Sequence, residues 1–229
     1  MRNNNLIKAI EKTTKIGGIK ISVSLPLLKK IIDKELLLKQ QYQLFEKQAR
    51  EEEYPNIANV FQAFQKGLNI IIRNHKRAIR KEDISEAEHS EKDLKSLVKS
   101  TRENIEKSKL DLSAQYIKEY KEAIKKIKNT LTEESYRIED DVVIYSLQWG
   151  QGVKKSHVKV LKLVQKYLKK ELKFEPINLD YTNPYVCEVC GHLIFGKPKR
   201  LCPVCDNPPE FFDSLENNIK KEPVEQEVS

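Results

Sequence analysis

The sequence predicts a mainly α-helical protein, in which an antiparallel four-helix bundle is followed by a small metal-binding module. Charged residues make up 33% and hydrophobic residues 39% of the 229 residues, which favours helices with solvated faces over a sheet protein. Apolar residues recur at alternating steps of three and four over four long stretches. All four cysteines lie close together near the C-terminus, in two closely spaced pairs.

The first two helices are predicted from start signals and apolar stripes. Ser24 followed by Pro26 marks a helix start. The stripe that follows contains one charged residue and consists of Leu28, Ile31, Glu35, Leu38, Tyr42, Phe45 and Ala49. Residues 54–56 predict a turn because proline occupies the middle position. The second stripe consists of Ile57, Phe61, Phe64, Leu68, Ile71, His75 and Ile79.

The third and fourth helices carry polar residues within their stripes. We interpret the polar residues 82–108 as a solvated extension of the third helix, with disorder as the alternative. The third stripe is Leu112, Tyr116, Glu119, Ala123, Ile127 and Leu131. The fourth is Val143, Leu147, Gly150, Lys154, His157, Leu161, Val164 and Leu168. Gly150 and Gly152 lie within the fourth helix, where we expect a bend or a close helix approach.

These elements divide the chain into five parts. We expect a loosely ordered extension over 1–24, the bundle over 25–175, a linker over 176–184, the metal module over 185–213 and a flexible tail over 214–229. The apolar runs are too short to span a membrane, and the N-terminus does not read as a signal sequence. The sequence therefore predicts a cytoplasmic protein that does not cross a membrane.

The four cysteines form two C-x2-C pairs, which predict one metal site held by Cys187, Cys190, Cys202 and Cys205. Four thiolates suit one tetrahedral ion, either iron or zinc. Disulfides are the less favoured alternative, because cysteine pairs in a cytosolic protein are usually metal ligands or redox groups. Gly191 and Asp206 follow the two pairs, where a tight turn can require positive φ and direct backbone N–H groups towards sulfur.

This C-terminal stretch resembles the rubredoxin-like domain of rubrerythrins. The pattern C-x2-C-G, G-x-P, C-P-x-C-x-x-P and a closing aromatic residue is carried by the cysteines with Gly196, Pro198, Pro208 and Phe212. The resemblance implies a ferritin-like bundle, one iron in the four-cysteine site that shuttles single electrons, and a homodimer. His192 and Asp206 depart from the family pattern, and zinc would fit the same four sulfurs.

In the bundle, the resemblance implies a remnant of a di-iron site. The family binds two irons with carboxylates and histidines from all four helices. Glu35, Glu119, Glu122 and His157 match family ligands, whereas Leu68, Ile71 and Lys154 stand where ligands should be. Apolar side chains cannot coordinate iron, and a lysine adds charge of the wrong sign. We therefore expect no bound di-iron centre, no catalytic residue and no peroxidase activity.

Three functions compete on this sequence. The leading one is electron transfer through the cysteine-bound iron to a redox partner protein, with the bundle as a scaffold. The second is a non-redox zinc ribbon with a basic helix that carries Lys154, Lys155, Lys159, Lys162, Lys166, Lys169, Lys170 and Lys173. These lysines alternate with a core stripe on a general solvated helix face rather than lining a groove with stacking residues, so we expect only weak nucleic-acid binding. The third is a di-iron peroxidase with substitute ligands such as His75.

Overall fold

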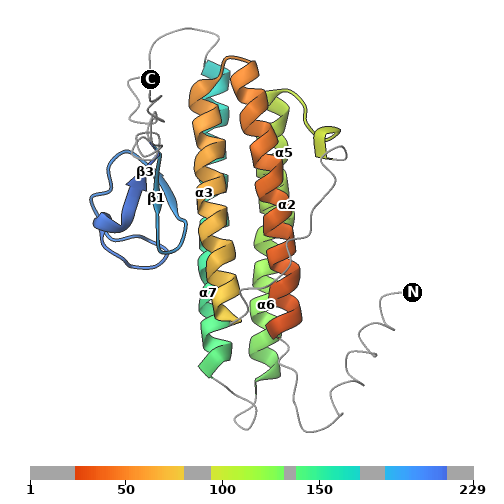
Figure 1. Ribbon diagram of the computed structural model, residues 1–229, viewed down its shortest axis with the longest axis vertical. Helices are drawn as coiled ribbons and strands as arrows, with labels where there is room; N and C mark the ends of the chain where they lie inside the picture. The colour runs from red at the N-terminus through yellow and green to blue at the C-terminus, as the bar shows by residue number, and fades with distance from the viewer. Residues whose placement is uncertain (1–23, 80–93, 132–137, 171–183, 216–229) are drawn as a thin grey trace, which may run out of the picture.

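The computed structural model describes residues 24–79, 94–131, 138–170 and 184–215. Four long helical stretches form a bundle, and a small three-stranded sheet follows it (Figure 1). The helical stretches are α2 (Ser24–Glu51), α3 (Pro55–Ala78), the third helix and α7 (Ile138–Lys170). The third helix consists of α5 (Thr101–Asp111), the π-helical segment η2 (Leu112–Tyr116) and α6 (Ile117–Thr130). The predicted fold class is confirmed.

The directions of the helices explain why the second and third are joined by a long connection. Neighbours α2 and α3 run antiparallel, as do α6 and α7, whereas α3 and the third helix run in the same direction (Figure 1). The third helix therefore begins at the end of the bundle opposite to the end of α3, as in ferritin-like bundles with one crossover. Residues 80–93 of this connection lie outside the described part of the chain, as do the predicted N-terminal extension up to residue 23, most of the linker and the tail beyond residue 215.

One helix start agrees with the sequence signals, and one differs from the prediction. The described part of α2 starts at Ser24, whose hydroxyl donates to Asp140 on α7 over 2.7 Å. Helix α3 begins with Pro55 at its first turn. The third helix begins only at Thr101, because the side chains of Ser100 and Glu103 form a capping box. The expected helical extension is therefore wrong over residues 98–100, which are not helical.

The bundle core is centred on aromatic rings between α2 and α3. Tyr42, Phe45, Phe61 and Phe64 are fully buried, and their ring centroids lie 5.3 to 6.4 Å apart. Burying one large apolar side chain contributes about 1.5 to 3 kcal/mol, so this cluster is a main source of the packing energy that joins the two helices. Leu68 and Ile71 belong to the same core.

The third helix contains a π-helical turn, and one residue of its predicted inward stripe is misplaced. In η2 the Ile117 N–H donates to the Leu112 carbonyl, five residues earlier. Beyond this turn Ala123 and Ile127 are buried as predicted, but Tyr120 rather than Glu119 is the buried residue one turn before them. Glu122 is exposed. The prediction that Glu119 faces the core is wrong, and so is the placement of Glu122 beside it, because Glu119 lies at the edge of the stripe, next to the buried Tyr120.

The C-terminal module is a three-stranded antiparallel sheet of β1 (Pro184–Cys187), β2 (Leu193–Phe195) and β3 (Phe212–Ser214) in the order β2-β1-β3. A short 3-10 turn, η4 (Pro209–Phe211), precedes β3. The module packs against α3 and α7 (Figure 1). Gly67 of α3 makes this contact close, because a Cβ there would lie 2.7 Å from the Gly191 carbonyl oxygen. No helix in the described residues is long and apolar enough to span a membrane.

Candidate metal centre

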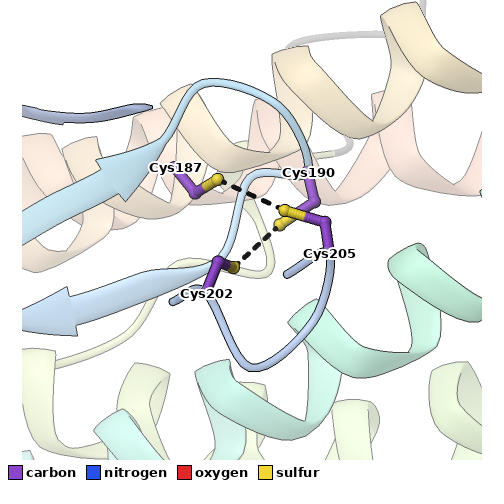
Figure 2. Close-up of side chains that lie close together, drawn as sticks. All are labelled: Cys187, Cys190, Cys202 and Cys205. Atoms are coloured by element: carbon purple, nitrogen blue, oxygen red, sulfur yellow. Dashed lines mark hydrogen bonds between the residues drawn. The ribbon is translucent and has the colours of Figure 1, made fainter. Parts of the chain in front are cut away.

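The four cysteine sulfurs converge between two loops of the module (Figure 2). All four Sγ atoms lie within 4.8 Å of one another. The Sγ atoms of Cys187 and Cys205 are 3.7 Å apart, and those of Cys190 and Cys202 are 3.6 Å apart. Cys187, Cys190 and Cys202 are buried, and Cys205 is half-buried. The predicted ligand set is therefore brought together in one place.

The two loops that carry the cysteines are built in the same way. The Gly191 N–H donates to the Cys187 carbonyl over 2.8 Å, and the Asp206 N–H donates to the Cys202 carbonyl over 2.9 Å. Gly191 has φ 84° and Asp206 has φ 56°, so both adopt the left-handed conformation expected after each pair. The His192 N–H then donates to the Cys190 sulfur over 3.4 Å. This is the N–H···S contact that the sequence predicted at the first loop.

The electrostatics of the cluster require a cation if all four sulfurs are to be thiolates. A hydrogen bond to the Cys187 sulfur raises the pKa of both Cys190 and Cys202, because each thiol then holds its proton against that sulfur. A metal ion takes the place of these protons and stabilises the thiolates. The soft, four-sulfur donor set fits iron or zinc. Among the described residues, the cysteines are the one cluster of three or more potential metal ligands.

His192, one of the departures from the rubrerythrin pattern, lies behind the first cysteine loop. Its ring packs edge-on against Phe212 with centroids 6.3 Å apart. Burial lowers the pKa of His192 to about 4, so the ring is neutral near pH 7. His192 thus replaces an aromatic side chain in packing and adds no charge beside the sulfurs.

The bundle interior contains a buried ion pair between α2 and α7. The Lys154 ammonium contacts the Glu35 carboxylate, and both side chains are 0% exposed. The Tyr120 hydroxyl donates to the other Glu35 oxygen over 2.9 Å. The Lys154 nitrogen also lies 5.9 Å from the centre of the Tyr116 ring. Burial lowers the pKa of Lys154, and Glu35 opposes that shift.

A hydrogen-bonded chain extends from this pair through His75. His75 Nε2 lies 2.8 Å from the Tyr120 hydroxyl, and His75 Nδ1 lies 2.6 Å from the Ser146 hydroxyl. Because the Tyr120 hydroxyl uses its hydrogen to donate a hydrogen bond to Glu35, His75 Nε2 must donate to Tyr120, and His75 Nδ1 must accept from Ser146. Burial lowers the pKa of His75 to about 3, so the ring is neutral and both nitrogens are engaged. His75 is therefore occupied in this chain rather than free to replace a missing metal ligand.

The remaining predicted remnant residues lie elsewhere. Glu119 pairs with Lys34 at the half-exposed edge of the bundle, and Glu122 is an exposed residue 3.8 Å from Lys118. Leu68 and Ile71 are 0% and 1% exposed in the apolar core. The structure thus brings Glu35 and Lys154 together but separates both from Glu119 and Glu122.

His157 is buried but takes no part in the chain. Its ring stacks on Phe64 with centroids 4.1 Å apart, and neither ring nitrogen has a hydrogen-bond partner among the described residues. Burial, followed by the charge on Lys154, holds its pKa well below the usual value. Sequence reasoning missed Tyr120 and Ser146 as members of the interior cluster: the predicted stripe took Glu119 in place of Tyr120, and a lone serine on a helix gives no signal.

Comparisons with known proteins identify the fold. No family model matches the sequence, and no curated protein matches it. Solved structures of nigerythrin in the mixed-valence, partially reduced and fully reduced all-ferrous states are similar, with 18%, 17% and 16% sequence identity and TM-scores of 0.66, 0.66 and 0.64. Each similarity covers 87% of this chain and 90% of the nigerythrin chain.

The described residues therefore have the architecture of a ferritin-like bundle with a C-terminal rubredoxin-like module. This is the fold of the nigerythrins, which are rubrerythrin family members, and it confirms in three dimensions the resemblance carried by the cysteine motif.

Proposed function

We propose that the protein is a rubrerythrin-like redox protein that transfers single electrons through one iron held by Cys187, Cys190, Cys202 and Cys205. The observation that carries the proposal is the convergence of four sulfurs within 4.8 Å in a rubredoxin-like module. The nigerythrin fold supports iron over zinc, because one of the similar structures is described as all ferrous. The bundle acts mainly as a scaffold for the module.

The residues around the sulfurs suit this role. A bound iron would supply one-electron chemistry by alternating between its ferric and ferrous states. The buried Cys187, Cys190 and Cys202 keep water from three sulfurs, and the His192 N–H stabilises negative charge on one of them. Cys205 is half-buried and offers the sulfur most open to solvent. The remaining residues of the loops hold these four atoms in place without taking part in the transfer.

We further propose that the bundle interior works without a di-iron centre. Lys154 already compensates the charge of Glu35, and Tyr120 occupies a second carboxylate oxygen. Two irons need several negative oxygen ligands, whereas Glu119 and Glu122 lie at the surface. On this basis we expect no peroxide reduction at the bundle.

Metal analysis and visible absorption test the proposal. Protein purified from iron-supplemented cells should contain one iron per chain and absorb visible light, because iron–thiolate bonds absorb there and zinc–thiolate bonds do not. The variant Cys202→Ser should lose the metal and the colour but keep the helical circular dichroism of the bundle. The matched control Leu201→Ser changes the neighbouring exposed residue and should keep both.

Other outcomes of this experiment would support the competing functions. One zinc and no colour would favour the zinc ribbon, whose basic α7 surface consists of the exposed residues Lys155, Lys159, Lys162, Lys166 and Lys169. Lys154 is not part of that surface, because it is fully buried. About three irons per chain, two of them retained in Cys202→Ser, would show that the bundle binds metal after all.

A further inference from the structure

A basic groove lies between α2 and α3. It has a volume of about 320 Å³. Four of its seven lining residues are cationic and none is acidic: Lys39, Arg73, Lys76 and Arg77. Leu36 and Ile72 contribute apolar side chains that are almost fully buried, and Arg73 and Arg77 are exposed. The groove therefore presents a positive rim over an apolar floor.

The groove is joined directly to the first cysteine loop. Arg73 Nη2 donates to the Glu188 carbonyl over 2.7 Å, and the Asn74 side chain donates to the Val189 carbonyl over 2.7 Å. Both carbonyls lie between Cys187 and Cys190. A molecule seated in the groove would thus contact the same arginine that holds the cysteine loop against α3.

We propose that this basic groove docks a small acidic protein that carries one electron at a time. The inference rests on the proposed function, because a single iron exchanges one electron per event and suits a one-electron partner rather than a two-electron hydride donor. The partner's centre would lose the electron that the cysteine-bound iron gains. The exposed arginines face outward, which suits contact with carboxylates on a protein surface.

The charge of the chain supports such an encounter. The formal net charge is +8, so an acidic protein is attracted at long range and then oriented by the local groove. Glu188 is exposed at the edge of the groove and would repel part of an acidic partner. We therefore place the partner's carboxylates towards Lys39 and Arg77, and Arg73 keeps its bond to the loop.

Binding of a probe protein tests the proposal. The probe is a small acidic [2Fe–2S] ferredoxin, and its affinity for the full chain is measured by calorimetry at low and high salt. The groove variant is Lys39→Glu with Arg77→Glu. The control, Lys125→Glu with Lys126→Glu, changes two exposed lysines of α6. Each substitution changes the charge by −2, so both double variants lower the net charge from +8 to +4.

We expect the groove variant to weaken binding at least about tenfold at low salt and the control to weaken it less than about threefold. Equal weakening in both variants, or none in either, would overturn the proposal. Stopped-flow reduction of the iron by the reduced ferredoxin gives a second readout. Its rate should fall more in the groove variant than in the control. If every variant lacks iron–thiolate absorption, the electron-transfer function fails, and calorimetry still decides whether the groove binds the acidic protein.

Discussion

At the scale of single residues, Lys154 and Glu35 show how a bundle interior can hold charge without metal. Removing either charge from water is unfavourable by several kcal/mol unless a partner and hydrogen bonds compensate it. Here each charge compensates the other, and Tyr120 satisfies a carboxylate oxygen. The ammonium thus supplies positive charge of the kind that a metal would bring to this carboxylate.

Removing one member of this pair should destabilise the protein strongly, whereas replacing both members should destabilise it only mildly. Lys154→Met leaves Glu35 buried without a counter-charge and should lower the free energy of unfolding by about 3 to 5 kcal/mol. Adding Glu35→Gln should restore most of the loss, because the amide oxygen still accepts from Tyr120. Urea unfolding followed by circular dichroism measures both values.

The half-exposed pair Lys34 and Glu119 is the natural control for this cycle. The same changes there, Lys34→Met and Glu119→Gln, should alter stability by no more than about 1 kcal/mol, because solvent screens the pair. If the losses from Lys154→Met and Glu35→Gln simply add, the two buried groups do not act as a pair and this account is wrong.

At the scale of helices, close contacts of two glycines explain why α7 tolerates them. A Cβ on Gly150 would lie 2.6 Å from the Tyr120 hydroxyl oxygen, and a Cβ on Gly152 would lie 3.0 Å from a methyl group of Val204. The sequence left a bend and a close helix approach as alternatives; these distances show a close helix approach at Gly150 and a close contact with the second cysteine loop at Gly152. Gly150 therefore makes room for the tyrosine that binds Glu35.

Replacing these glycines with alanine should destabilise the protein at position 150 and change its stability little at position 152. Alanine is favoured over glycine inside a helix by about 1 kcal/mol. In Gly150→Ala this gain is outweighed, because the buried Tyr120 ring cannot move away without losing its hydrogen bonds; we expect a net loss of about 1 to 3 kcal/mol. In Gly152→Ala the half-buried Val204 can shift, and stability should change by less than about 1 kcal/mol. Thermal unfolding of the two variants compares them, and equal losses would contradict the explanation.

The helices also show what could be predicted from sequence. Pro55 and the cysteine loops were predictable, because turns and metal knuckles depend on a few neighbouring residues. The buried residue one turn before Ala123 was not, since both Glu119 and Tyr120 fit the helical repeat, at a step of three or four from Tyr116. Ala123 and Ile127 are buried as predicted, whereas Glu119 was placed where Tyr120 lies.

At the scale of the whole molecule, the module and the bundle form one packed unit along α3. Gly67 and Gly191 bring their backbones together, Lys66 pairs with Asp213 over 2.6 Å, and Arg73 holds the cysteine loop. These contacts link residues more than a hundred positions apart, so neither capping signals nor periodicity could reveal them. They place the proposed docking groove beside the first cysteine loop.

The buried histidines should also make the stability of the whole molecule depend on pH. His75 has a folded-state pKa of about 3, and that of His157 lies well below the usual value. Unfolded histidine titrates near 6.5, so below that pH the unfolded chain binds protons that the folded chain does not. The contribution of these histidines should thus be constant above about pH 6.5 and fall as the pH drops towards the folded-state values, by up to about 1.4 kcal/mol per pH unit for each histidine.

The variant His157→Phe isolates one of these contributions. Its ring can stack on Phe64 as the imidazole does, and His157 has no hydrogen bond among the described residues that the change would remove. We expect unchanged or higher stability at pH 7.5. Between pH 6.5 and 5 the free energy of unfolding should fall less steeply, with a slope smaller by up to about 1.4 kcal/mol per pH unit. Urea unfolding of the bundle is compared in the Cys202→Ser background, where loss of metal in acid cannot contribute. Parallel pH profiles with and without His157→Phe would mean that this histidine is protonated in the folded protein, and that its buried position does not keep it neutral.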